Sequence, residues 1–175
     1  ASTPEFMTFV SGMTCNTYDE YLEATGTFQA PAQNFIYADN HNEIGLRING
    51  KLPIKTYGEG VMIGDGSSTK NGWQGFIPRN ENPQERNPTR GYVSSSNQWS
   101  ASTEYPYFFN GNFEGYRGRM ANSVLSQDGT FSIADMKALQ NSNYSIEAEE
   151  ALGIILPLLD SNNLEQASLL SEWNF

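Results

Sequence analysis

The spacing of apolar residues changes twice along this chain of 175 residues. Residues 34–39 are β-branched and aromatic, and residues 43–50 contain apolar side chains at alternate positions, which is the period of a β-strand, whereas residues 113–175 repeat them at helical spacing. Between these segments, residues 52–92 are rich in Gly, Pro and Asn and contain only short apolar islands. Strands followed by a run of helices are typical of an α+β fold. We therefore predict an α+β fold with long loops.

The N-terminal third contains signals for one helix and one β-hairpin. Thr17 and Glu20 have the spacing of a capping box, and apolar residues follow at helical spacing. We therefore predict a short helix from about 17 to 26. A β-branched and aromatic segment at 34–39 and an alternating segment at 43–50 then flank a polar turn at residues 40–42, which predicts a β-hairpin.

Residues 52–92, here called the excursion, are long for a connection. Loops of such length are usually functional or attached to a neighbouring element, so we expect an ordered segment with at most short strands. The pattern then changes to helical, and Ser132 and Asp135 form a second capping box. The helical spacing covers residues 113–125, 132–140, 146–159 and 164–173.

The charge of the chain excludes several classes of partner. Its formal net charge is −10, and its ten Lys and Arg residues are scattered, so it has no cationic surface for a nucleic acid or an anionic membrane. The sequence contains no run of eighteen apolar residues and no signal peptide pattern. A single cysteine, Cys15, excludes an internal disulfide and a thiolate metal cluster.

The residues by themselves form no complete catalytic constellation. His41 is the only histidine, and it lies in the predicted hairpin turn, so neither a Ser-His-Asp triad nor a histidine metal site is supported. The glycines of residues 58–66 lack the spacing of a phosphate-binding loop. Asp39 and Glu43 flank the turn, where an acid–base pair or a calcium cradle is conceivable, but turn chemistry explains them better.

Several blocks of the sequence resemble one known family in the same order. They are APAQNFIYADNHNEIGLRINGKLPI at 30–54, GWQGFIPRNENPQERNPTRGYVSSSNQ at 72–98, YRGRM at 116–120, and a helical block at 131–159. Together they are similar to the β subunit of the penicillin acylases, which are N-terminal-nucleophile hydrolases. The similarity covers about residues 19–160, and four colinear blocks are far more specific than any one motif.

The resemblance implies a function for particular residues. In this family an N-terminal serine attacks an amide carbonyl with its own α-amino group as the base, and an asparagine side chain helps to hold the oxyanion. That asparagine corresponds to Asn97 here. Arg117, the first arginine of YRGRM, would order the active site or orient substrate, or would instead form a structural ion pair at a helix start. Gln98 and Tyr105 are candidates for the acyl pocket.

The resemblance also implies an architecture. The family's core is an αββα sandwich, and this chain would be a single internal fragment of the β subunit. Residues of about 17–92 would provide a helix, the hairpin and long loops, residues of about 93–112 the active-site loop, and residues of about 113–175 a helical layer. The partners would be the α subunit, the N-terminal part of the β subunit and a small acylated-amine substrate. The parent would be periplasmic or secreted.

The sequence departs from the family pattern in three places. No segment resembles the serine-led start of the β subunit, and Ala1-Ser2 does not match it, so we expect the isolated chain to be inactive. Some family members carry a calcium ion with one aspartate ligand after a Tyr-Pro pair, where this chain offers only Asn110. We therefore expect no cofactor in the chain, with calcium possible in the parent. The second arginine of YRGRM, Arg119, is one position closer to the first than usual, so its role stays open.

Two other functions remain as alternatives. One is a non-catalytic binding or scaffold module derived from an acylase. The other is a glycan-binding domain, which only the aromatic and Asn content of the loops suggests. If the chain is a fragment, we also expect it to expose an unusual apolar surface or to self-associate.

Overall fold

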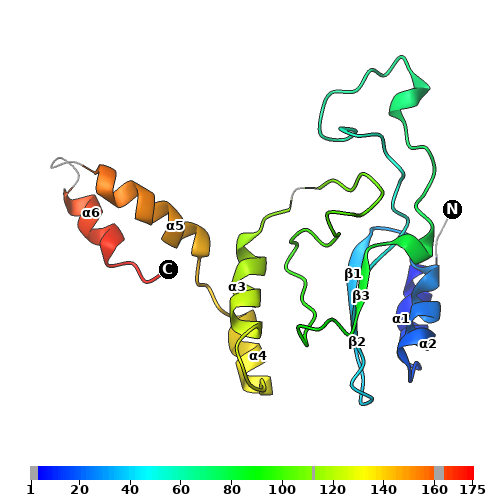
Figure 1. Cartoon of the computed structure of the whole chain (residues 1–175), viewed down its shortest axis with the longest axis horizontal. Coiled ribbons are helices and arrows are strands. Elements are labelled where there is room, and N and C mark those ends of the chain that lie inside the picture. The colour runs from blue at the N-terminus through cyan, green and yellow to red at the C-terminus, as the bar shows by residue number, and fades with distance from the viewer. Residues whose placement is uncertain (1–3, 112, 160–163) are drawn as a thin grey trace. The chain divides into compact units, whose positions relative to one another are not determined.

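The computed structural model describes residues 4–111, 113–159 and 164–175 (Figure 1). Ala1-Ser2 and residue 112 of the predicted active-site loop therefore lie outside the described residues. The chain forms two compact units. The first contains residues 1–95 and 99–112, and the second contains residues 96–98 and 113–175. The boundary between the units therefore runs through the predicted active-site loop.

The first unit contains the predicted hairpin within a three-stranded antiparallel sheet of order β1-β2-β3 (Figure 1). Gln33 pairs with Asn49 at one end of the hairpin and Ala38 with Ile44 at the other, so the chain reverses between Ala38 and Ile44, around the predicted turn. The strands are β1 (Gln33–Ala38), β2 (Ile44–Asn49) and β3 (Gln84–Arg86).

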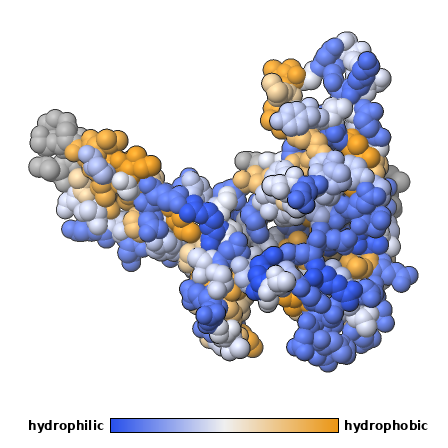
Figure 2. Space-filling model, in the orientation of Figure 1, coloured by the Kyte–Doolittle hydropathy of each residue, from blue (hydrophilic) through white to orange (hydrophobic). Residues whose placement is uncertain are grey.

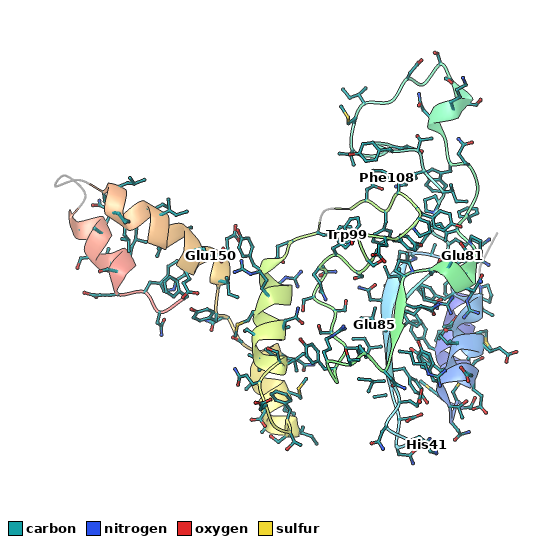
Figure 3. The ribbon with its side chains drawn as sticks, viewed as in Figure 1. His41, Glu81, Glu85, Trp99, Phe108 and Glu150 are labelled. Carbon is teal, nitrogen blue, oxygen red and sulfur yellow. The ribbon has the colours of Figure 1, made fainter. Side chains whose placement is uncertain are left out.

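The hairpin turn is organised by Asp39. Its Oδ1 accepts hydrogen bonds from the backbone N–H groups of His41, at 2.8 Å, and Glu43, at 3.0 Å. Asn42 supplies a positive φ of 65°, which asparagine tolerates better than most residues. His41 lies at the tip, away from the rest of the sheet (Figure 3). Asp39 therefore has the local bonding that turn chemistry predicts, whereas the Glu43 carboxylate accepts from Arg86 Nε at 2.5 Å and from Asn87 Nδ2 at 3.0 Å.

Two helices precede the sheet: α1 (Glu5–Gly12) and α2 (Tyr18–Ala24), the latter continued by a 3₁₀ turn, η1 (Thr25–Thr27). The predicted helix is α2, and Thr17 caps it by accepting from the Glu20 N–H at 3.2 Å. The Glu20 carboxylate bonds the N–H of Asn16 and not that of Thr17, so the capping box is shifted by one residue. Helix α1 was not predicted, although Glu5 places an acidic residue in its first turn, which is typical of a helix N-terminus.

Two backbone segments of the excursion, residues 52–54 and 74–77, are hydrogen-bonded to each other. The backbone of Leu52 accepts from the Ile77 N–H at 2.8 Å, and Ile54 bonds residues 74 and 75 through both its N–H and its C=O, at 2.9 Å each. Leu52 and Ile77 then bury their side chains together with Ile48 of β2. Within the described residues the excursion otherwise contains β3 and the 3₁₀ turns η2 (Thr69–Asn71) and η3 (Arg79–Glu81), as the prediction of an ordered segment with short strands required.

The second unit is helical, as predicted. Ser132 and Asp135 form the complete predicted capping box, with both reciprocal hydrogen bonds present. The first helix begins at Tyr116, three residues later than the apolar spacing indicated, because Gly115 occupies its N-cap. The elements are α3 (Tyr116–Leu125), α4 (Ile133–Gln140), α5 (Ile146–Ile155), the 3₁₀ turn η4 (Leu156–Leu158) and α6 (Leu164–Ser171).

Both units expose large apolar side chains, and Figure 2 shows such residues on α5 and on the excursion. Ile63 is fully exposed and Met62 is 76% exposed on the excursion, whereas Leu158 is 77% exposed after α5. The expected unusual apolar surface or self-association of the isolated chain stays a prediction. Within the described residues, no helix combines the length and the apolar character that crossing a membrane requires.

Candidate functional site

Three of the four predicted site residues lie in the second unit. Asn97 and Gln98 belong to the short segment 96–98, which packs with the helical residues, and Arg117 lies in the first turn of α3. Tyr105 belongs to the first unit. The structure therefore brings Asn97, Gln98 and Arg117 into one compact unit and places Tyr105 in the other.

Asn97 has an unusual backbone and a directly bonded side chain. Its φ is 61°, in the left-handed region, where asparagine is enriched because its short amide can bond locally. Asn97 is exposed, and its Oδ1 accepts a hydrogen bond from Arg117 Nη2 at 2.8 Å. A bond from a guanidinium is charge-assisted and fixes which end of the amide carries the oxygen.

Arg117 is positioned by Glu114, a residue that the sequence analysis did not single out. Glu114 Oε1 accepts from the backbone N–H of Arg117 at 2.8 Å, and its Oε2 accepts from Arg117 Nε at 3.0 Å. The first of these bonds is the main reason that the pKa of Glu114 is lowered. A glutamate three residues before an arginine at a helix start is the signal that could have identified it.

The two interpretations of Arg117 are compatible in this geometry. The arginine forms an i, i+3 ion pair at the start of α3 and also donates to Asn97. It makes both contacts at once because Nε and Nη2 are separate donors of one planar guanidinium. The resulting chain of contacts runs from Glu114 through Arg117 to Asn97.

Segment 96–98 lies close against α3 at a glycine. A Cβ placed on Gly118 would lie 2.9 Å from Gln98 Cβ and 3.2 Å from its Cγ, so only glycine permits this approach. The Gln98 Oε1 also accepts from the Ser96 N–H at 2.6 Å, across Asn97. Gln98 therefore has a packing role next to Asn97, while its predicted place in an acyl pocket stays a prediction.

Tyr105 forms part of an aromatic cluster in the first unit. Its hydroxyl donates to the backbone carbonyl of Glu81 at 3.0 Å, and its ring contacts those of Tyr107 and Phe109. Burial, together with the nearby Tyr107, raises the pKa of Tyr105 to about 12, so its hydroxyl stays protonated at neutral pH. Its predicted role in substrate binding stays a prediction.

Arg119, whose role the sequence left open, links two helices. Its Nη2 lies 2.5 Å from Glu150 Oε1 and so joins α3 to α5 (Figure 3 labels Glu150). This ion pair is the main cause of the raised pKa of Arg119 and of the lowered pKa of Glu150. Arg119 is therefore engaged in an ion pair within the helical unit.

The arrangement around Asn97 can offer a neutral hydrogen-bond donor backed by a positive charge. Because Oδ1 is bonded by Arg117, the two N–H groups of Nδ2 are the free end of the amide, and no described residue accepts a hydrogen bond from them. An amide does not titrate near neutral pH, so this donor is available at any physiological pH. The described residues contain no group of three or more His, Cys, Asp or Glu residues able to hold a metal.

Comparisons with known proteins identify the family. A family model described as penicillin amidase matches residues 1–175. The acyl-homoserine lactone acylase QuiP of Pseudomonas fluorescens strain Pf-5 is 25% identical over 142 residues, which cover 78% of this chain and 17% of that protein. QuiP of Pseudomonas syringae pathovar tomato is 24% identical over 166 residues, which cover 85% of this chain and 20% of that protein.

A solved structure shows the same fold. The thermostable penicillin G acylase of Alcaligenes faecalis matches with a TM-score of 0.65 at 19% identity, over 95% of this chain and 31% of that chain. This confirms the predicted partial α+β architecture. The chain spans 20% or less of the length of the two QuiP proteins and about a third of the solved acylase. Because the family model matches its whole length, the chain belongs to the penicillin amidase family.

Proposed function

We propose that this chain is part of an amidohydrolase that cleaves the linear amide of an acylated amine. The chain covers only a fraction of its relatives, so the remainder of the protein would supply the nucleophile and most of the acyl pocket. In the family pattern that nucleophile is an N-terminal serine with its own amine as the base. The isolated chain is therefore expected to be inactive. By resemblance to the family, the parent is expected to be periplasmic or secreted.

Asn97 would be the oxyanion donor of this enzyme. The observation that supports the proposal is the 2.8 Å hydrogen bond from Arg117 to Asn97 Oδ1, which leaves the N–H groups of Nδ2 as the free end of the amide. Attack on an amide produces a tetrahedral intermediate with a negatively charged oxygen. A donor fixed in advance stabilises that charge without reorganising, and losing one such donor costs roughly a hundred- to a thousandfold in kcat.

Arg117 would strengthen this donor without contacting the substrate. A cation bonded to the amide oxygen draws electron density from the nitrogen, which makes the N–H groups better donors. Glu114 would keep the guanidinium in place through its two hydrogen bonds. We therefore assign both residues a positioning role for Asn97.

Two substrate classes fit the proposal, N-acyl homoserine lactones and acylated β-lactams. The names of the QuiP relatives favour the first class, and the name of the solved acylase favours the second. The acyl group is best identified with a panel of phenylacetyl, phenoxyacetyl and long-chain acyl amides that includes N-acyl homoserine lactones.

The test uses the full-length protein that contains this chain. Asn97→Gly removes the amide but keeps a residue that tolerates φ of 61°, and Asn97→Asp keeps the shape but replaces the donor with a carboxylate. Both variants should lower kcat by roughly a hundred- to a thousandfold with a smaller change in KM. Asn42→Gly is the matched control, because Asn42 also has a positive φ of 65° but lies in the hairpin turn. It should retain wild-type kcat.

The outcome decides between the proposal and its main alternative. Full activity of Asn97→Gly would remove the oxyanion assignment even if the protein is an amidase. A folded wild-type protein that hydrolyses no member of the panel would favour a non-catalytic binding or scaffold module.

A further inference from the structure

Lys55 and Asn110 form a cross-link between two distant segments of the first unit. Lys55 Nζ donates to Asn110 Oδ1 at 3.0 Å, and the two half-buried residues are separated by 55 positions in the sequence. Neighbouring rings support the same link, since Tyr57 and Phe108 lie 5.1 Å apart between centroids (Figure 3 labels Phe108). The start of the excursion is thereby attached to the end of the predicted active-site loop.

The position of Asn110 gives this contact its significance. In calcium-carrying members of the family, an aspartate in the corresponding stretch is a ligand, and here the only candidate is Asn110. Calcium binds six to eight oxygen atoms, usually with several carboxylates among them. Asn110 offers one neutral oxygen, and that oxygen already accepts a hydrogen bond from an ammonium group.

The surroundings do not fit a calcium ion either. The described residues contain no group of three or more acidic, His or Cys residues. A Cβ on Gly60 would lie 3.2 Å from Asn110 Nδ2 and 3.5 Å from Lys55 Nζ, so the backbone of the excursion closes over the pair. A divalent cation at this oxygen would also be repelled by the ammonium group beside it. The residues of this chain therefore do not fit calcium at Asn110.

We propose that the ammonium group of Lys55 takes the place of a bound cation at Asn110 and holds the excursion to residues 107–110 without calcium. No described carboxylate forms an ion pair with Lys55, so the Asn110 oxygen is the partner that holds the ammonium group in place. The ammonium group is covalently attached to the chain, so the contact with Asn110 forms whatever the calcium concentration.

Hydrogen exchange followed by mass spectrometry tests this proposal on the full-length protein. In the wild type, neither added calcium chloride nor a chelator should change the exchange of residues 56–63 and 107–110. Lys55→Met keeps the length of the aliphatic stem but removes the charge, and exchange in both segments should accelerate by about tenfold or more. Lys70→Met, also on the excursion, is the matched control and should leave both segments unchanged.

Two results would overturn the proposal. One is slower exchange of these two segments in wild-type protein when calcium is added, because that would show a metal ion acting there. The other is exchange in Lys55→Met that equals exchange in Lys70→Met. The calcium comparison uses only wild-type protein, so it decides the question even if Lys55→Met does not fold. Neither readout involves hydrolysis, so a failure of the Lys55 proposal can be told apart from a failure of the proposed amidase function.

Discussion

Replacing Gly118 with alanine should have two opposite effects on the free energy of unfolding. Alanine favours a helix over glycine by about 1 kcal/mol. At Gly118, however, the new methyl group would lie 2.9 Å from Gln98 Cβ, well inside the ordinary contact distance of about 3.5–4.0 Å between carbon atoms. The contact involves the Cβ of Gln98 and not the end of a flexible side chain, so segment 96–98 must move or the helix must shift.

The expected magnitude follows from these two terms. Overpacking of this kind costs about 1–3 kcal/mol, which the gain in helix propensity offsets by about 1 kcal/mol. Gly118→Ala should therefore lower the free energy of unfolding by about 0–2 kcal/mol. Gly153→Ala is the matched control, since Gly153 lies within α5 and a Cβ there meets no atom within 4 Å. It should raise the free energy of unfolding by about 0.5–1 kcal/mol.

Urea unfolding of the chain, followed by helical circular dichroism, measures both variants. The difference between them should be about 0.5–3 kcal/mol, with Gly118→Ala the less stable. In the full-length protein Gly118→Ala should also lower kcat, because Asn97 is adjacent to the displaced Gln98, whereas Gly153→Ala should not. Equal stabilisation by both substitutions would refute the packing of segment 96–98 on α3.

Three further changes test single contacts. Asn82→Ala leaves two main-chain carbonyls without their Nδ2 donor in a buried site, so urea unfolding should show a loss of about 1–3 kcal/mol. The Ser132 hydroxyl lowers the pKa of Asp135 below 3.8. The stability advantage of wild type over Asp135→Asn should therefore be complete at pH 7 and vanish as the pH falls through that lowered pKa. An advantage that does not depend on pH would contradict this. Tyr105→Phe removes the bond to the Glu81 carbonyl, and thermal unfolding should report a loss of about 0.5–1.5 kcal/mol.

Local signals in the sequence predicted local structure well. The capping box of α4 and the N-cap of α2 depend on residues three positions apart, and both formed where the sequence indicated. The hairpin also formed around the predicted turn, with its strands at Gln33–Ala38 and Ile44–Asn49. Helix α1 was missed because its start has no capping box: Pro4 at the N-cap makes no side-chain capping bond, and Glu5 is the acidic residue of the first turn.

Long-range contacts decided what the sequence left open. Nothing local indicated that Leu52 would pair with Ile77, since the 24 intervening residues have no regular period. The link from Lys55 to Asn110 is likewise invisible until the chain is folded, because a single lysine and a single asparagine occur in every loop-rich sequence.

The candidate site shows the same division. The family resemblance named Asn97 and Arg117, but their role depends on one 2.8 Å contact between residues twenty positions apart. Helix spacing and caps are set by neighbours along the chain, so the sequence by itself determined the helices and the hairpin. The tertiary structure alone decided which end of the Asn97 amide is free and which residue holds Arg117, because these contacts join groups that only folding brings together.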